Sequence, residues 1–505
     1  MTTYLLAHDL GTSGNKATLF TSEGALVKSC VHSYPTDYFN NNWAEQDANH
    51  WWRAICDSTQ EILIGIDAKS VAVVSFSGQM MGCLCVDREG NPLRKAIIWA
   101  DMRAERQANQ IREGMDEQDF YRITGHKISP SYSIEKLMWV RDNEPAVYAQ
   151  TYKMLQAKEY ILFKLTGAFV TEYTDACGTN VFDLNTLDWS EKLISLAGID
   201  GDKLPEAHPS THIAGEVHAA AAEATGLVKG TPVVCGGGDG ICAAVGAGCI
   251  KPGMAFNYIG SSSWISLTTE APIFDDGLRT FNWPHIVPGY YSPCGAMQSA
   301  GGSFSWLKNE IAKFETVEAE KQGVSPYERI NDVIAQSPVG ANGLIFLPYL
   351  LGERSPRWNP NARGAFIGIK MEHQRADVFR SVLEGISLNL GLILDIFKQH
   401  VEIPEMVLIG GGAQGALWRQ ILADIYELPV LKPNYLEEAT SMGAAITGGV
   451  GVGVFPNFDV VDRFIKMETR QTPIVENSAV YAKIKPIFDA SYHALVDVYE
   501  QMAKL

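Results

Sequence analysis

Asp9-Leu10-Gly11-Thr12-Ser13-Gly14-Asn15-Lys16 lies between two short apolar runs, Tyr4 to Ala7 and Ala17 to Phe20. Apolar runs of this length, separated by glycines, predict two buried strands joined as a hairpin. The tip carries a carboxylate, two hydroxyls and a lysine. Its backbone N–H groups could wrap phosphate oxygens while the acid holds a metal ion. Ordinary turns also favour Asp, Gly and Thr, so the residues alone leave both interpretations open.

A second stretch of the same kind is Met254–Thr268, which reads as strand, turn and strand with Gly260-Ser261-Ser262-Ser263 at its tip. Two similar hairpins in one chain predict two related halves that face one cleft. A chain of 505 residues is also too long for a single hydrophobic core. We therefore expect two domains, residues 1–248 and 249–505, with the glycine-rich segment Ala243–Pro252 as the crossing between them.

The composition is that of an ordinary globular protein, with 46% apolar and 20% charged residues. The net charge of −17 argues against a nucleic-acid partner, because phosphate backbones need basic surfaces. The nine cysteines show no CxxC pair and no zinc-ligand spacing, which indicates buried thiols in a reducing compartment. Because there is no signal-peptide pattern and no apolar run of about 18 residues, we expect a cytoplasmic protein without a membrane partner.

The first candidate catalytic residue is Asp239, which follows the apolar strand Pro232–Cys235 and the glycines of Gly236-Gly237-Gly238. A carboxylate at a strand end, beside glycines that let a ligand approach, is a typical position for a general base. Asp239 could equally be the N-cap of the small-residue helix that begins at Ile241. The sequence pattern alone leaves the base and the cap as alternatives.

Two other strand ends carry polar or small residues. Ile409-Gly410-Gly411-Gly412-Ala413 joins a strand to a helix, a turn that admits a flat ring or an anion, although an ordinary glycine-rich turn reads the same. It is not GxGxxG, and no GxxxxGK[ST] occurs in the chain. Elsewhere Gln79, Asp101 and Arg103 could bind substrate hydroxyls beside an apolar wall of Met80, Met81 and Trp99. The alternatives are a core methionine pair and a structural contact between Asp101 and Arg103.

Apolar runs and helical periodicity predict most of the remaining elements. Strands are expected at 4–8, 15–20, 25–33, 71–77, 83–86, 96–99, 231–235 and 407–409, and helices at 51–64, 376–397, 416–426 and 479–503. A β-rich start followed by alternating strands and helices predicts a mixed α/β sheet with helices on its faces.

Two longer motifs carry a family resemblance. The stretch Ser131-Tyr-Ser133-Ile-Glu-Lys136-Leu-Met-Trp139-Val-Arg-Asp142-Asn143 fits the first signature of the FGGY carbohydrate kinases. The second signature fits Gly364-Ala-Phe-Ile-Gly368-Ile369 followed by Asp377-Val378-Phe-Arg-Ser381-Val382-Leu383-Glu384. Glu353-Arg-Ser-Pro356, Trp358–Gly364 and Glu438–Gly443 resemble the xylulokinase branch of that family. The resemblance runs from Tyr4 to about Gly449, nearly the whole chain.

The resemblance implies an α/β, two-domain, actin-like (ribonuclease-H-like) fold with an interdomain cleft, in which ATP with Mg²⁺ phosphorylates a small sugar or polyol. Asp239 corresponds to the family's catalytic base, and Asp9 with Asp239 to the magnesium-associated acids. Gln79, Met80, Met81, Asp101, Arg103 and Gly240 fall on the substrate side. ATP and phosphate positions are Thr12, Ser13, Lys16, Gly260, Ser261, Gly301, Ser305, Gly411 and Gly412. The resemblance is also compatible with a homodimer.

Two departures from the xylulokinase pattern concern the substrate. Where those enzymes usually read Gly-Gln-Met-His, this chain has Met81, and where they read Gly-Asp-Asn, it has Gly240. Both lost side chains are polar sugar ligands in the resembling enzymes, so affinity for the hydroxyls they serve should fall. D-Xylulose is therefore the leading candidate, with another ketopentose, a pentitol, a tetritol or a sugar acid as alternatives. A non-kinase ATPase of the same superfold is the alternative of a different class.

Overall fold

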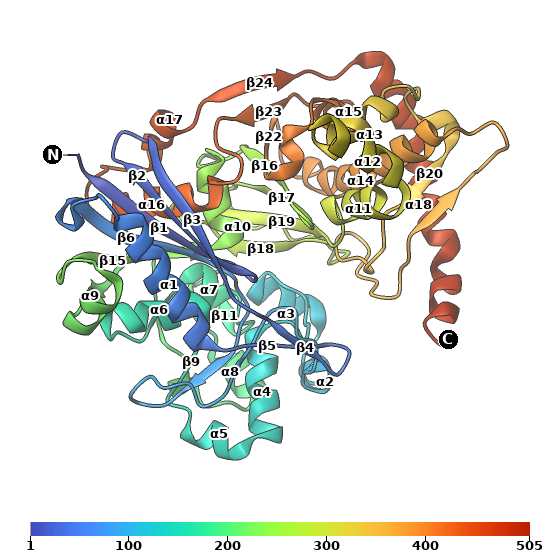
Figure 1. The fold of residues 1–505 in the computed structure, drawn as a ribbon. Helices are drawn as coiled ribbons and strands as arrows, with labels where there is room; N and C mark the ends of the chain where they lie inside the picture. The colour runs from blue at the N-terminus through green and yellow to red at the C-terminus, as the bar shows by residue number, and fades with distance from the viewer. Residues whose placement is uncertain (1) are drawn as a thin grey trace.

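The computed structural model describes residues 2–505 and contains two mixed β-sheets with two helices packed between them (Figure 1). The N-terminal sheet has the strand order β14-β15-β6-β1-β2-β3. β1 pairs antiparallel with β2 and parallel with β6, so it lies at the centre. The strands are β1 (Tyr4–Leu10), β2 (Gly14–Thr21), β3 (Leu26–Ser33), β6 (Val71–Gly78), β14 (Ile213–Glu216) and β15 (Pro232–Gly238).

The C-terminal sheet repeats this arrangement and adds one strand at its edge. Its order is β18-β19-β17-β16-β22-β23-β24, with β16 pairing antiparallel to β17 and parallel to β22. β16 and β17 are therefore the counterparts of β1 and β2, which confirms the two hairpins expected from the sequence. The strands are β16 (Ala255–Ile259), β17 (Ser263–Leu267), β18 (Phe281–Pro284), β19 (Tyr291–Met297), β22 (Met406–Ile409), β23 (Val430–Pro433) and β24 (Met467–Gln471).

Helices α10 (Asp239–Gly246) and α16 (Ala439–Gly451) lie between the two sheets. Helix α10 follows β15, and α16 follows β23. Their apolar side chains reach both sheets: Ile241 and Val245 of α10 join the core of the N-terminal sheet, whereas Ala243 packs with strands of the C-terminal sheet. The crossing is too close for a side chain, because a Cβ on Gly443 would lie 1.9 Å from the carbonyl oxygen of Cys242. A glycine-mediated helix crossing therefore fastens the two lobes together.

The outer faces of both sheets are covered by amphipathic helices. In the N-terminal lobe α1 (Ala48–Leu63) packs on β2 and β3, and α6 (Ala157–Thr166) packs on α1 and β15. In the C-terminal lobe α14 (Arg375–Lys398), α15 (Ala416–Tyr426) and α18 (Val475–Met502) bury one large apolar core. The helix expected at 51–64 begins earlier because Asp47 caps it by accepting from the Asn49 backbone N–H at 2.9 Å.

The remaining elements are short and connect or flank the two sheets. The strands are β4 (Asp37–Phe39), β5 (Trp43–Gln46), β7 (Leu84–Val86), β8 (Ala96–Ile97), β9 (Lys153–Leu155), β10 (Val170–Glu172), β11 (Phe182–Asp183), β12 (Asp188–Trp189), β13 (Glu206–His208), β20 (Ile345–Leu347) and β21 (Ala365–Ile367). The helices are α2 (Glu105–Gly114), α3 (Glu117–Thr124), α4 (Ser133–Asn143), α5 (Pro145–Gln150), α7 (Tyr173–Cys177), α8 (Glu191–Ala197), α9 (Ala219–Thr225), α11 (Gly301–Trp306), α12 (Lys313–Gln322), α13 (Pro326–Ile334) and α17 (Val461–Phe464). Within residues 2–505, no helix has the length and apolar character that a bilayer crossing requires.

Candidate active site

A cavity of about 180 Å³, here called the first cavity, lies where β6 and β15 end, between the two lobes. It brings together six residues predicted from the sequence, namely Gln79, Met80, Met81, Trp99, Asp239 and Gly240. The other lining residues are Ser131, Tyr132, Ile241, Ser262, Trp264, Ser266, Phe281, Trp283, Cys294, Ala296, Arg354 and Trp358. Six of the walls are therefore aromatic, a surface on which the C–H faces of a carbohydrate can pack.

Asp239 is the first residue of α10, and Gly238 occupies the cap position. Its carboxylate accepts a hydrogen bond from the Gly240 backbone N–H at 2.7 Å. Burial first, and then repulsion from Asp9, raise the pKa of Asp239 to about 7 from its ordinary value of 3.8. A carboxylate with a pKa near the working pH and an open cavity in front of it is suited to accept a proton.

The hairpin β1–β2 carries the remaining predicted phosphate ligands. Its register places Asp9 opposite Lys16, and the Ser77 hydroxyl donates to the Asp9 carboxylate at 2.9 Å. Burial raises the pKa of Asp9, while Ser77 and Lys16 oppose that shift. The Lys16 ammonium donates at 2.9 Å to the carbonyl of Glu437 in the C-terminal lobe. Thr12 is anchored beside the first cavity, because the Trp99 indole N–H donates to its hydroxyl at 2.8 Å, and Ser13 is exposed.

The orientation of the Gln79 amide follows from a fixed chain of hydrogen bonds. Gln46 donates to the Thr12 carbonyl at 2.6 Å and accepts from the Trp51 indole at 2.9 Å, which determines which of its side-chain atoms is oxygen. That oxygen accepts from Gln79 Nε2 at 2.8 Å. Among residues 2–505, Gln79 Oε1 has no hydrogen-bond partner, so it can accept from a ligand hydroxyl.

Two further polar atoms in this cavity lack a partner among the described residues, and both are donors. They are the indole N–H of Trp264, whose ring stacks on Tyr258 with centroids 4.1 Å apart, and Nε of Arg354. Buried donors and acceptors without partners cost free energy, so a ligand that supplies hydroxyl or carboxylate oxygens would be stabilised here. A polyhydroxylated compound fits this combination of aromatic walls and orphaned polar atoms.

Asp101 and Arg103 are engaged with each other instead of lining the cavity. The Arg103 guanidinium contacts the Asp101 carboxylate at 2.7 Å, and both side chains are almost fully buried. Asp101 also accepts from the Ala44 backbone N–H at 2.6 Å, while Arg103 packs over the Trp43 ring at 3.8 Å from its centroid. The structure thus contains the structural contact that the sequence left as the alternative for this pair.

A second cavity, of about 470 Å³, lies in the C-terminal lobe. It collects all six predicted nucleotide residues of that lobe, namely Gly260, Ser261, Gly301, Ser305, Gly411 and Gly412. Its other lining residues were not predicted from the sequence: Ile259, Phe304, Ser325, Tyr327, Glu328, Asn331, Gln414, Gly415 and Trp418. The two cavities meet at the β16–β17 turn, because Ser261 lines the second cavity and its neighbour Ser262 lines the first.

A buried ionic network supports the turn that carries Asp239. The Gly238 backbone N–H donates to the Thr174 hydroxyl at 2.8 Å, and that hydroxyl in turn donates to the Glu172 carboxylate. Lys158 contacts Glu172 at 3.2 Å and Asp175 at 3.0 Å, with all three charged side chains fully buried. No sequence motif pointed to this network, since its members are joined only by the tertiary fold.

The two lobes match the two domains of one known protein family. Residues 4–246 match the N-terminal domain of the FGGY family of carbohydrate kinases, and residues 255–452 match its C-terminal domain. The chain belongs to this family. Among related sequences, a gluconokinase of Bacillus licheniformis is 32% identical over 505 residues, covering 100% of this FGGY kinase and 98% of the relative.

Other relatives of this FGGY kinase carry a different substrate in their names. A xylulose kinase of Staphylococcus epidermidis is 34% identical over 496 residues, or 97% of this chain and 96% of the relative. The crystal structure of a gluconate kinase from Lactobacillus acidophilus superposes with a TM-score of 0.92 at 27% identity, covering 99% of this chain and 100% of that one. The two-domain sugar-kinase fold expected from the sequence is confirmed, whereas the names of the relatives divide between gluconate and xylulose.

Proposed function

We propose that this FGGY kinase transfers the γ-phosphate of ATP to a hydroxyl of an open-chain, polyhydroxylated substrate, with D-xylulose as the first candidate. The observation that carries this proposal is the meeting of two cavities at Ser261 and Ser262, with Asp239 in the wall of the first. The substrate would occupy the first cavity and the nucleotide the second. Phosphoryl transfer needs positioning and charge neutralisation more than covalent chemistry, and this arrangement offers both.

Each residue then has a defined task. Asp239 accepts the proton of the attacking hydroxyl, since burial holds its pKa near 7. Gln79, Trp264 and Arg354 orient the substrate through the polar atoms that lack partners. Lys16 and the amides of the two hairpin tips, with Thr12 and Ser13 on one and Gly260 and Ser261 on the other, face the phosphates. These groups let an acidic protein bind a polyanion locally.

The carboxylates of Asp9 and Asp239 fit a magnesium site. The Asp9 carboxylate raises the pKa of Asp239, and burial raises the pKa of Asp9, so both carboxylates lack full compensation for their charge. Hard oxygen ligands of this kind are those that Mg²⁺ takes alongside substrate phosphates. When bound, Mg²⁺ would neutralise charge that develops on the transferring phosphoryl group.

A sugar acid such as gluconate is the second candidate substrate, and the position of Arg354 in the first cavity favours it. Its guanidinium lines the first cavity, its Nε has no partner in the described part of the chain, and burial lowers its pKa. A substrate carboxylate would pair with this cation. The test measures ADP release with D-xylulose, D-ribulose, xylitol, erythritol and gluconate under identical conditions. ATP turnover that ignores every acceptor would instead indicate a non-kinase ATPase.

We expect Thr174→Val to lower kcat by about tenfold. The change leaves the buried Gly238 N–H without an acceptor, so the turn before Asp239 is held less rigidly and the carboxylate is positioned less well. Thr174→Ser should restore most of the rate. Thr225→Val is the matched control, since that hydroxyl also accepts a backbone N–H and donates to the Ala221 carbonyl, but on α9. If both valine variants lower stability and neither lowers kcat, Thr174 has only a structural role.

Gly411→Val should weaken ATP binding by about fivefold or more, corresponding to roughly 1 kcal/mol of overpacking. A Cβ at Gly411 meets no atom within 4 Å, so the new side chain projects into the second cavity without straining the fold. Titration calorimetry with a non-hydrolysable ATP analogue measures the effect, and Gly411→Ala should give a smaller one. Unchanged nucleotide affinity in both variants would place ATP elsewhere.

The two lobes should close on their ligands, because water must be kept from the γ-phosphate. The segment after α10 contains Gly248 at φ +79° and Gly253 at φ +86°, positions that favour glycine and suit a hinge at the proposed boundary between 1–248 and 249–505. X-ray scattering should give a smaller radius of gyration with substrate plus ATP analogue than without ligands. The analogue alone is the control, and equal radii in all states would contradict closure.

A further inference from the structure

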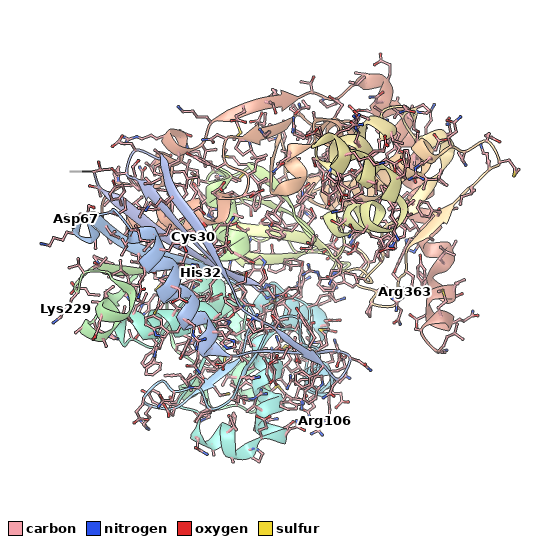
Figure 2. All side chains as sticks on the ribbon, in the orientation of Figure 1. Cys30, His32, Asp67, Arg106, Lys229 and Arg363 are labelled. Carbon is pink, nitrogen blue, oxygen red and sulfur yellow. The ribbon has the colours of Figure 1, made fainter. Side chains whose placement is uncertain are left out.

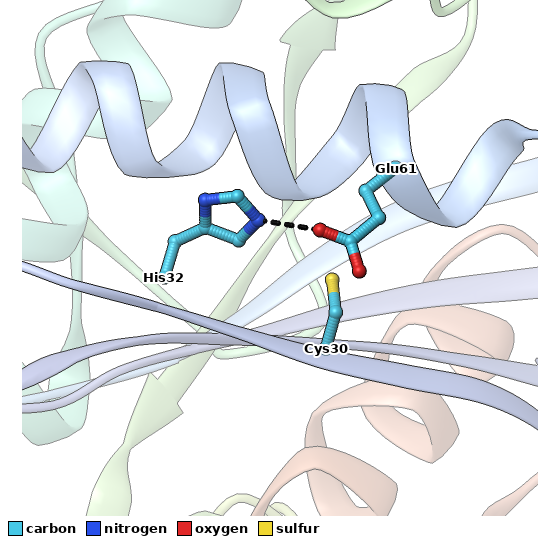
Figure 3. A group of neighbouring side chains, drawn as sticks. All are labelled: Cys30, His32 and Glu61. Carbon is cyan, nitrogen blue, oxygen red and sulfur yellow. Dashed lines mark hydrogen bonds and ion pairs between the residues drawn. The ribbon is translucent and has the colours of Figure 1, made fainter.

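Three potential metal ligands meet on the outer side of the N-terminal lobe, away from both cavities. Cys30 and His32 lie on the edge strand β3, and Glu61 lies in the last turn of α1 (Figures 2 and 3). Sγ of Cys30, a ring nitrogen of His32 and a carboxylate oxygen of Glu61 all lie within 4.8 Å of one another. We propose that Cys30, His32 and Glu61 form a binding site for a thiophilic divalent cation of the Zn²⁺ type.

The set of donor atoms selects the class of metal. A thiolate and an imidazole prefer Zn²⁺ and related borderline ions, whereas Mg²⁺ and Ca²⁺ prefer oxygen donors alone. Three protein ligands with one position left for water is a common arrangement for Zn²⁺. The site is therefore chemically distinct from the pair Asp9 and Asp239, which offers only carboxylate oxygens.

The backbone already brings the three side chains to one place. Cys30 and His32 are two residues apart on a strand, so both point toward α1, as Figure 3 shows. His32 Nε2 lies 2.8 Å from a Glu61 oxygen, and the Cys30 thiol donates weakly to the Ser58 carbonyl at 3.5 Å. Donor atoms around a tetrahedral Zn²⁺ stand roughly 3.3–3.7 Å apart. Side-chain rotations that separate His32 from Glu61 slightly and draw Cys30 inward would create that geometry.

The charges around the cluster permit a cation. Lys28 lies on the same face of β3, but its ammonium donates to the carbonyls of Ile62 and Ile64 at the end of α1. Lys28 is thus held by the helix end and forms no ion pair with Glu61. The side chains of His32 and Glu61 are 28% and 54% exposed, so an ion and its water ligand can reach them from solvent.

Binding would clip the edge strand to the helix that covers its sheet. His32 is the register partner of Asn15 in β2, and Asn15 donates to Ser58 of α1 at 2.8 Å. A metal held by Cys30, His32 and Glu61 would therefore brace the strand pair that ends in the phosphate hairpin. The expected consequence is a metal-dependent gain in thermal stability, because a ligand that binds only the folded state shifts the unfolding equilibrium.

The test uses the full chain, freed of metal and kept reduced. Zn²⁺ affinity is measured by competition with a chromophoric chelator, and Co²⁺ is added separately because its absorption reports thiolate ligation. Wild type should bind one Zn²⁺, show the thiolate-to-cobalt band and melt at a higher temperature with Zn²⁺. Cys30→Ser, His32→Gln and Glu61→Gln should each weaken binding by about tenfold or more, since even outer-shell partners are worth about 10–100-fold.

Cys56→Ser is the matched control, because Cys56 is another half-exposed free thiol on α1 that lies outside the cluster. It should keep the affinity, the cobalt band and the rise in melting temperature. The proposal is overturned if wild type binds no Zn²⁺ in competition with the chelator. It is also overturned if the three ligand variants bind as tightly as wild type, which would place the ion at other side chains. Glu61→Gln alters an exposed residue, so the comparison does not depend on the folding of Cys30→Ser.

Discussion

Replacing Asp239 with asparagine should lower kcat by roughly 10²–10⁴-fold, the usual contribution of a positioned general base. The amide keeps the size of the side chain and can still accept from the Gly240 N–H, but it cannot take a proton from the attacking hydroxyl. Steady-state kinetics at saturating ATP and substrate measure the loss. Calorimetry with an ATP analogue is the control, and it should give nearly unchanged affinity because the nucleotide residues lie in the other cavity.

The same variant should be more stable than wild type above pH 7. Folding raises the pKa of Asp239 from 3.8 to about 7, so ionising it in the folded state costs free energy at neutral and alkaline pH. The cost shrinks as the pH falls and disappears below pH 3.8, where the carboxyl is protonated in both states. Asparagine does not titrate, and we expect a gain of about 2–4 kcal/mol above pH 7 that fades toward pH 4. Denaturant unfolding in the presence of a chelator checks this.

The two measurements separate a base from a structural residue. A variant that keeps more than about a tenth of the wild-type rate would remove Asp239 from the base role. A variant that loses both activity and stability at every pH would instead indicate that the carboxylate holds α10 in place. If Asp239 is a general base held in an unfavourable environment, the asparagine variant should lose turnover and gain stability above pH 7.

The two hairpins and most strands of the two large sheets could be predicted from local sequence patterns. The apolar runs around Asp9 and around Ser261 are short and bounded by glycine, which marks buried strands joined by tight turns. The packing of α10 on α16 between the two sheets was not predictable, because it depends on the close approach of Gly443 to Cys242, which are far apart in the chain.

The residues of the candidate site also form two groups: those that local sequence could place and those that it could not. Residues at strand ends, such as Gln79 and Gly411, could be placed because strands of one sheet end at a common edge. Trp283 and Arg354 could not, since they reach the first cavity from the edge of the second sheet and from a loop. Asp101 also follows a strand, but its charge is paired internally with Arg103, and local sequence does not distinguish a binding residue from a structural one.

Cys30 and His32 illustrate a third limit. Zinc-ligand spacing in a sequence is recognised by pairs such as CxxC, and a lone Cys-x-His on one strand gives no such signal. The third member of the cluster, Glu61, is supplied by the helix that packs on that strand. The position of Glu61 beside Cys30 and His32 follows only from the packing of α1 on the edge strand β3, which the sequence does not reveal.

Introducing Met81→His and Gly240→Asn together should raise kcat/KM for D-xylulose by about 5- to 150-fold, equivalent to roughly 1–3 kcal/mol of restored hydrogen bonding. The resemblance to xylulokinases implies a histidine and an asparagine as polar sugar ligands at these two positions. In the present chain a thioether and a bare backbone line the corresponding part of the first cavity. Wild type should therefore use D-xylulose less efficiently than the double variant, because a hydroxyl at that end has no side-chain partner.

The structure accommodates both substitutions, which makes the experiment decisive. Met81 has φ +63°, a conformation that histidine adopts more readily than methionine, and its carbonyl stays tied to the Lys136 ammonium at 2.7 Å. A Cβ on Gly240 would meet only the Trp264 indole nitrogen, at 3.9 Å, which is an ordinary contact. Each single variant and wild type are the controls, measured with D-xylulose and gluconate. If wild type already uses D-xylulose efficiently and the double variant gains nothing, these two positions do not determine the choice of substrate.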